Sequence, residues 1–228
     1  MAQILLIRHG QASWGKRNYD ELSPRGVEQA RVLGQALKQR NIQPDRIITG
    51  AMTRHKQTAM ACLDAMGLPH DWDEDRRWNE YDHQELIVRH KPLYRSRTVM
   101  MADLARTLRP REAFQEMFEQ ALDRWLEKGH SREYRETWPM FATRVGAALD
   151  TLAVTPAATT LVFTSGGAIS ATVARLWNMP DSEWKKLNRV IANATVTKVV
   201  VGRNGTHLSS FNEHTHFEGD NRHLLSYR

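Results

Sequence analysis

Compact apolar runs alternate along the chain with longer segments in which apolar residues recur every three or four positions. The compact runs that predict buried strands are AQILLIR at 2–8, RIIT at 46–49 and TTLVFT at 159–164, and a short strand is expected around 70–73. Between the first two runs, Val27, Ala30, Leu33 and Leu37 fall on one face of a predicted helix. This order of strand, helix, strand and helix indicates an α/β protein.

Local signals mark where the predicted elements begin and end. Ser23 is a suitable N-cap, and Pro24 then takes the first helical position. Gly67, with Pro69 just beyond it, ends a helix formed by TRHKQTAMACLDAM, and a helix that opens with glycines follows the third strand. NATVTKVVVGRNGTHLSSF predicts a hairpin with Asn204-Gly205 as its turn.

The chain from about 84 to 152 is largely helical in pattern, which is too long for one crossover between strands. We therefore expect a single domain over 1–228, a three-layer α/β/α sandwich around a mostly parallel sheet, with a helical insertion over one end. Ligands of such folds bind at the carboxyl ends of the strands.

Composition points to a globular cytoplasmic protein. Charged residues make up 25% of the chain and hydrophobic residues 41%. The single cysteine, Cys62, excludes an intramolecular disulfide and favours a reducing compartment. The apolar run Ile4–Ile7 is too short for a signal peptide, and the uncharged stretch 151–174 contains Pro156 and two adjacent glycines, which disfavours a membrane span.

The formal net charge of +6 favours an anionic ligand. The excess is concentrated between Glu85 and Glu112, where seven basic residues accompany three acids. The basic residues are Arg89, Lys91, Arg95, Arg97, Arg106, Arg109 and Arg111. This stretch either selects an anionic substrate or is a solvated helix face. Nucleic-acid binding is disfavoured, because no aromatic-rich recognition element accompanies the arginines.

Polar residues follow each of the three main predicted strands. Arg8-His9-Gly10 follows the first, TGAMTR leads to Arg54 after the second, and Ser165-Gly166-Gly167 follows the third. These segments can converge, because the carboxyl ends of parallel strands face one crevice. Two guanidinium groups beside an imidazole and helix N-termini suit a phosphoryl group, whose oxygens accept from both kinds of donor.

Six segments resemble, in order, the motifs of one known family. They are LLIRHGQASW, LSPRGVEQARVLGQAL, IITGAMTRHKQTA, WNEYD, FATRVGAALDTL and NATVTKVVV. Together they resemble the histidine phosphatase superfamily, also called the phosphoglycerate mutase-like family. Only about 84–137 is left unmatched, at the position where the family has its substrate cap, so the resemblance implies a helical cap inserted there. The pairing of Arg-His-Gly-Gln-Ala-Ser with Thr-Ser-Gly-Gly is similar to a bacterial branch of that family.

The resemblance implies a phosphohistidine mechanism that requires no metal or other cofactor. His9 would be the nucleophile, because a neutral imidazole needs no proton removed before attack and its phosphoramidate is labile to water. Arg8 and Arg54 would neutralise charge on the phosphoryl oxygens. Glu80 would protonate the departing oxygen and then activate water.

Ser165 stands where the family has its second histidine, in a block that usually reads His-Gly-Gly. A serine hydroxyl offers a hydrogen bond but no cation, and losing one stabilising group typically costs on the order of 100-fold in rate. Ala12 and Gly15 stand where the family often has a Ser or Thr and an Asn, which would contact the phosphate. Ser13 or Asn18 could supply these two contacts instead.

The sequence leaves further site assignments open. Gly10, Gln11 and Gly166 join the expected substrate-binding residues. Asp82 and Glu85 lie close enough in sequence to Glu80 to be alternative general acids.

Two other interpretations of polar motifs are disfavoured. Ser165 lacks the first glycine of a G-x-S-x-G elbow, because Phe163 occupies that position. NEHTHFEGD is a polar tail more readily than a metal site, although His214 or His216 could replace the lost imidazole if the tail lies near the pocket.

We therefore expect a phosphomonoesterase that hydrolyses a small phosphorylated substrate through phosphorylated His9. The alternative is a phosphate-ligand-binding protein of the same fold with weak or no turnover, which Ser165 motivates. A mutase is disfavoured, because the loop from Trp14 to Leu22 is short and lacks a Gly-Trp-x-Asp pattern. The sequence identifies neither the substrate nor the oligomeric state.

Overall fold

The computed structural model describes residues 1–13 and 20–227. The chain divides into two compact units, one formed by Met1–Glu80 with Arg144–Arg228 and the other by Tyr81–Thr143. The second unit includes 84–137, the stretch expected to be inserted, and begins and ends a few residues beyond it.

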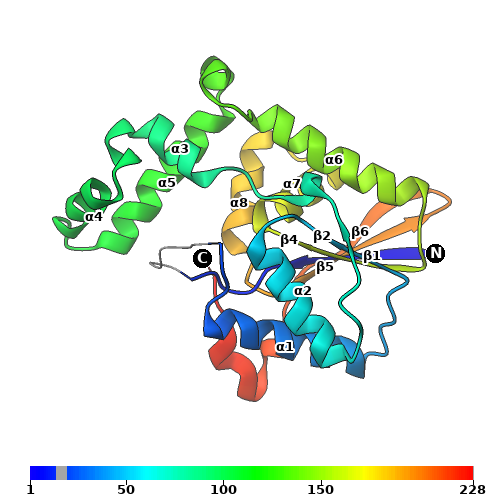
Figure 1. Ribbon diagram of the computed structural model, residues 1–228. Helices are drawn as coiled ribbons and strands as arrows, with labels where there is room; N and C mark the ends of the chain where they lie inside the picture. The colour runs from blue at the N-terminus through cyan, green and yellow to red at the C-terminus, as the bar shows by residue number, and fades with distance from the viewer. Residues whose placement is uncertain (14–19, 228) are drawn as a thin grey trace. The chain divides into compact units, whose positions relative to one another are not determined.

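The first unit contains a six-stranded sheet in the order β3-β2-β4-β1-β5-β6 (Figure 1). Its strands are β1 (Ala2–Arg8), β2 (Arg46–Thr49), β3 (Asp73–Glu74), β4 (Thr159–Thr164), β5 (Val196–Gly202) and β6 (Gly205–Glu213). The strands from β3 to β1 pair in parallel, whereas β5 and β6 are antiparallel to their neighbours. The mostly parallel α/β sheet expected from the apolar runs is confirmed.

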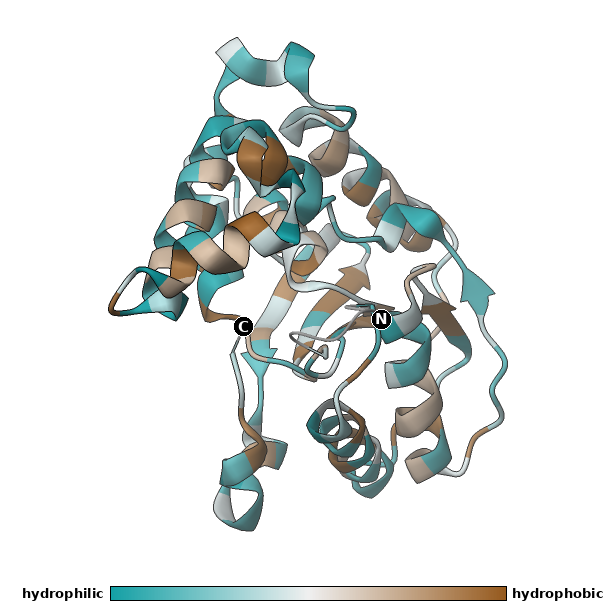
Figure 2. Cartoon of the chain, turned by 60° about the vertical axis from the view of Figure 1, so that its left-hand side comes forward, coloured by the Kyte–Doolittle hydropathy of each residue, from teal (hydrophilic) through white to brown (hydrophobic). Residues whose placement is uncertain are grey.

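Helices cover both faces of this sheet. On one face lie α1 (Pro24–Gln39) and α2 (Thr53–Met66), and on the other lie α7 (Gly166–Leu176), α8 (Trp184–Val190) and the part of α6 (Trp138–Val154) that starts at Arg144 (Figure 1). Apolar side chains of α1 and α2 pack against β1 and β4 in a core that includes Leu5, Ile7, Leu33, Leu63 and Phe163. The helices of Figure 2 accordingly carry both hydrophobic and hydrophilic residues along their length.

Predicted capping signals are confirmed where side chains satisfy helix ends. The Ser23 side chain accepts a hydrogen bond from the Gly26 N–H, and Pro24 opens α1. Gly67 adopts a left-handed conformation, with φ of 77°, immediately after α2. A short polar side chain thus determines the beginning of α1, and a glycine determines the end of α2, as the sequence indicates.

Two local predictions need correction, and one helix was not predicted. The short strand lies at Asp73–Glu74 instead of 70–73, because only these residues reach the edge of β2. In the hairpin, Gly202 pairs with Gly205, so the turn consists of Arg203 and Asn204. Helix α8 was not predicted, because only seven residues form it and their pattern is too short to show a clear periodicity.

The second unit is helical, with α3 (His83–His90), α4 (Arg97–Ala105), α5 (Pro110–Leu126) and the first residues of α6. Its interior contains an aromatic cluster in which the Tyr81 and Trp125 rings lie 5.1 Å apart and the Trp125 and Trp138 rings 5.6 Å apart. Aromatic packing therefore stabilises a unit that has no sheet in it.

The three acids of the basic stretch each pair with one of its cations. The pairs are Arg89 with Glu85, Lys91 with Asp103, and Arg109 with Glu112. Such exposed pairs contribute at most about 1 kcal/mol each to stability. Within the described residues, no helix is both long and apolar enough to cross a membrane.

Candidate active site

The ends of β1, β2 and β4 are joined by backbone hydrogen bonds. The His9 N–H donates to the Thr164 carbonyl at 2.9 Å, and the Gly50 N–H donates to the Phe163 carbonyl at 3.0 Å. Arg8 is in register with Thr164, so His9 and Ser165 leave neighbouring strands at the same edge. Three of the polar segments singled out in the sequence thus begin side by side.

His9 is a buried, neutral imidazole whose proton has a defined position. Its Nδ1 lies 2.7 Å from the Gly10 carbonyl, which can only accept a hydrogen bond, so Nδ1 carries the proton and Nε2 the lone pair. Burial holds the pKa of His9 well below its usual value, and the charges of Arg54 and Arg8 lower it further. Nε2 is therefore available as a nucleophile at neutral pH.

Arg54 lies against this nucleophilic nitrogen. Its Nε donates to Nε2 of His9 at 3.2 Å, and its Nη1 lies 2.7 Å from a carboxylate oxygen of Asp20. The other oxygen of Asp20 accepts from the Thr53 N–H, at the beginning of α2. Sequence reasoning missed Asp20, because the pair joins residues 34 positions apart and one carboxylate in a polar loop gives no signal.

Arg8 is also buried, and its guanidinium donates to the Ile191 carbonyl. It packs beside Gly166, where an added Cβ would lie 3.3 Å from the Nε of Arg8. Arg54 is therefore in direct contact with His9, and the charge of Arg8 lies near enough to lower the pKa of His9.

Ser165 lies at the N-cap position of α7, yet its side chain makes no capping hydrogen bond. Its Oγ instead lies 2.6 Å from Nε2 of His55. The rings of His9 and His55 are 5.8 Å apart between centroids. Sequence reasoning missed His55, although its position directly after Arg54 was a usable signal.

Glu80 is held at the beginning of α7, where the Gly167 N–H donates to its Oε2 at 3.1 Å. The alternative carboxylates have other partners in the second unit. Asp82 caps α3 through the Gln84 and Glu85 N–H groups, and the Glu85 carboxylate accepts from the Arg135 N–H. Glu80 is thus the carboxylate of this group that contacts the Ser165-Gly166-Gly167 turn.

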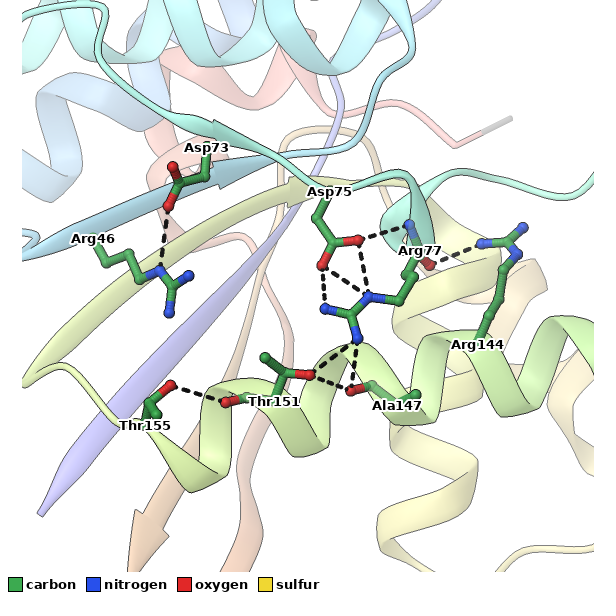
Figure 3. Close-up of polar contacts among 8 residues, drawn as sticks. All are labelled: Arg46, Asp73, Asp75, Arg77, Arg144, Ala147, Thr151 and Thr155. Atoms are coloured by element: carbon green, nitrogen blue, oxygen red, sulfur yellow. Dashed lines mark hydrogen bonds and ion pairs between the residues drawn. The ribbon is translucent and has the colours of Figure 1, made fainter.

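A set of arginine contacts fixes the backbone that leads to Glu80 (Figure 3). Arg77 forms a bidentate pair with Asp75 and also donates to Thr151 on α6. From the same helix, Arg144 donates to the Arg77 and Asn79 carbonyls, both at 2.8 Å, and reaches the Glu80 carbonyl at 3.4 Å. The acid-bearing segment is therefore anchored to α6 by charged donors.

The loop residues expected to bind substrate have defined partners of their own. The amide oxygen of Gln11 accepts from Ser23 Oγ, and the Ser13 hydroxyl donates to the Leu22 carbonyl. The Gly10 N–H donates to Thr58 Oγ1 at 3.1 Å. Asn18, together with Trp14 and Gly15, lies outside the described residues. The substrate-binding roles of Gly10, Gln11, Ser13, Asn18 and Gly166 remain predictions.

A hydrogen-bonded chain links the C-terminal segment to the backbone of the nucleophile. Gln29 donates to Ser226 Oγ and accepts from the Gln11 N–H. Ser226 donates to Asn193, which in turn donates to the His9 carbonyl at 3.3 Å. This chain reaches His9 through residues for which the sequence had predicted no role.

The two tail histidines are bound to backbone carbonyls. Nε2 of His216 lies 2.9 Å from the Ala194 carbonyl, and Nδ1 of His214 lies 2.6 Å from the Asn212 carbonyl. The imidazole in contact with Ser165 is that of His55. No group of three or more His, Cys, Asp or Glu side chains among residues 1–13 and 20–227 is arranged to hold a metal ion.

Comparison with sequences of known proteins identifies relatives of this chain. A family model described as the histidine phosphatase superfamily (branch 1) matches residues 4–98 and 104–214. A 2,3-bisphosphoglycerate-dependent phosphoglycerate mutase from Chelativorans sp. (strain BNC1) is 34% identical over 90 residues, which are 36% of this chain and 44% of that protein. The matched region therefore spans less than half the length of this curated relative.

Solved structures match nearly the whole chain at low identity. A mutant phosphoserine phosphatase from Entamoeba histolytica in complex with phosphoserine matches with a TM-score of 0.64 and 17% identity, covering 95% of this chain and 99% of that one. A phosphoglycerate mutase from Bacillus anthracis str. Sterne matches with a TM-score of 0.63 and 21% identity, covering 94% of each chain. These likenesses establish the fold, and with the family model they show that the chain belongs to the histidine phosphatase superfamily.

Proposed function

We propose that this protein is a phosphomonoesterase that transfers the phosphoryl group of a small phosphorylated substrate to His9 and then to water. The observation that carries the proposal is the geometry of His9. Its proton is fixed on Nδ1 by the Gly10 carbonyl, and its lone pair on Nε2 lies 3.2 Å from the Arg54 guanidinium. A nucleophile and a charged donor for phosphoryl oxygens are thus adjacent.

In the first step, Nε2 of His9 attacks phosphorus while the bond from phosphorus to the substrate oxygen breaks. For this attack, Arg54 must move its N–H from Nε2 to a phosphoryl oxygen, where the guanidinium stabilises negative charge. Glu80, in its protonated form, gives its proton to the departing oxygen, so the leaving group is a neutral alcohol. The proton of His9 stays on Nδ1, hydrogen-bonded to the Gly10 carbonyl, throughout.

In the second step, water attacks phosphorus and the bond from phosphorus to Nε2 breaks. Glu80, now a carboxylate, takes one proton from the water, and inorganic phosphate leaves. The position of Glu80 at the N-terminus of α7 supports this role, since its carboxylate reaches the turn that contains Ser165.

A second candidate function is binding of a phosphorylated ligand without efficient turnover. Ser165 supplies no cation, and the Asp20 carboxylate, 2.7 Å from Nη1 of Arg54, offsets part of the positive charge of that arginine. Both features reduce the positive charge available to a phosphoryl transition state, where electrostatic stabilisation supplies much of the rate.

The two candidates are separated by assaying para-nitrophenyl phosphate and a panel of phosphorylated metabolites, together with acid-labile phosphoryl labelling of the protein. The phosphatase predicts turnover and labelling that His9→Ala abolishes. Phosphate binding without turnover or labelling in the wild-type protein would leave the binding function. As a matched control, His207→Ala removes an imidazole from the exposed β6 and leaves labelling unchanged.

A further inference from the structure

His55 and Ser165 form a buried pair beside His9 that the mechanism above does not use. His55 lies in the first turn of α2, directly after Arg54, and Ser165 follows β4. Both residues are 0% exposed, and their Nε2 and Oγ atoms are 2.6 Å apart. A contact this short fixes the rotamer of the serine hydroxyl.

The surroundings of His55 decide which nitrogen carries its proton. Within the described part of the chain, Nδ1 is buried and has no hydrogen-bond partner. It lies against Gly50, where an added Cβ would stand only 2.3 Å from Nδ1. A buried N–H without an acceptor is rarer in proteins than an acceptor without a donor. The proton is therefore on Nε2, which donates to Ser165 Oγ.

This direction of donation leaves the hydroxyl proton of Ser165 for a third group. The hydroxyl does not cap α7. Ser165 leaves β4 next to His9, whose N–H donates to the preceding Thr164 carbonyl. Burial and the Arg54 charge hold the pKa of His55 well below its usual value, so the ring donates as a neutral group.

We propose that His55 is a positioning residue whose Nε2–H orients the Ser165 hydroxyl, so that the serine O–H donates to a phosphoryl oxygen during transfer to His9. His55 on α2 and Ser165 after β4 would together supply one hydrogen bond, which a single side chain on the turn after β4 could supply alone. This inference rests on the proposed function. The opposite tautomer would make His55 a base and Ser165 a nucleophile, and would leave a buried Nδ1–H without an acceptor.

The first test is a double-mutant cycle on kcat with para-nitrophenyl phosphate. Ser165→Ala removes the donor and should lower kcat about 100-fold. His55→Ala removes only its orientation and should lower kcat about 10- to 100-fold, with a smaller effect on KM. The double variant should be no slower than Ser165→Ala, because the two groups act as one unit. His70→Gln, at an imidazole bound to Asp64 on the surface, is the matched control.

Conservative variants separate positioning from packing. His55→Gln keeps an N–H donor near the position of Nε2 and should recover most of the kcat that His55→Ala loses. The combination of His55→Ala with Ser165→His moves the imidazole to the turn itself and should be faster than His55→Ala alone. Ser165→His by itself should have a low kcat, because the His55 ring, 2.6 Å from Oγ of Ser165, occupies the space that a second imidazole would need.

Three results would overturn the inference. Wild-type kcat in folded His55→Ala, with labelling still lost in His9→Ala, would reject positioning while leaving the phosphatase intact. Labelling on Ser165 would reject the direction of the hydrogen bond. A ¹⁵N spectrum of the wild-type protein that shows His55 protonated on Nδ1 would reject it without any variant. Labelling and turnover that His9→Ala leaves unchanged would instead reject the proposed function.

Discussion

A single backbone carbonyl decides the chemistry of His9. Because the Gly10 carbonyl can only accept, it keeps the ring proton on Nδ1 and leaves the lone pair on Nε2. We predict that long-range ¹H–¹⁵N spectra show the Nδ1–H tautomer and that the His9 pKa lies well below 6.5, because burial and two arginines disfavour the charged ring. The His9→Ala spectrum assigns the signal. An Nε2–H tautomer, or titration near pH 6.5, would contradict this.

The pKa of His216 makes the stability of the protein depend on pH. Burial lowers its pKa from 6.5 in the unfolded chain to about 4 in the folded protein. As the pH falls, His216 therefore binds a proton in the unfolded chain before it does so in the folded protein. Its contribution to the free energy of unfolding is present above pH 6.5 and is lost towards pH 4, at about 1.4 kcal/mol per pH unit. Between pH 6.5 and 4.5, the free energy of unfolding measured with urea should fall by about 2 kcal/mol more in the wild-type protein than in His216→Gln. Equal losses in both proteins would reject the shift.

At the scale of elements, the loop carrying His9 is held by a close backbone approach to α1. A Cβ at Gly10 would lie 2.2 Å from the Gly26 carbonyl oxygen, and neither backbone can give way easily. We predict that Gly10→Ala lowers the free energy of unfolding by about 1–3 kcal/mol and weakens phosphate binding, because the loop must shift. Gly129→Ala is the control, since nothing lies within 4 Å of its Cβ. Equal melting temperatures of the two variants would show that the loop tolerates the shift.

Elements were predictable from sequence where their signals are local. The strands at 2–8, 46–49 and 159–164 follow from compact apolar runs, and the ends of α1 and α2 follow from Ser23 and Gly67. The contact between Arg54 and His9 agrees with the expectation that the ends of parallel strands lie at one edge.

The remaining site contacts depend on packing between segments distant in sequence. The contact between His55 and Ser165 joins residues 110 positions apart, and its formation depends on the rotation of α2 about its own axis. The chain from Ser226 through Asn193 to His9 likewise requires the C-terminal segment to return to β1. No local pattern encodes either contact, so only the folded structure reveals them.

At the scale of the whole molecule, charge is distributed unevenly. Four of the six units of net positive charge come from residues 85–112, where the three acids are already paired with cations. A protein with this charge attracts phosphomonoesters over distances set by the Debye length, which shortens from about 30 Å at 0.01 M salt to about 10 Å at 0.1 M.

We therefore predict that KM for an anionic phosphomonoester rises several-fold between 0.01 and 0.5 M potassium acetate, while kcat stays constant, because screening weakens attraction without altering the transferred group. Repeating the series in potassium chloride separates screening from competition by a particular anion. Replacing Arg95, Arg97, Arg106 and Arg111 by Gln lowers the formal charge from +6 to +2 and should flatten the salt dependence. If that variant keeps the wild-type slope, the stretch is a solvated helix face, and the attraction arises from the arginines around His9.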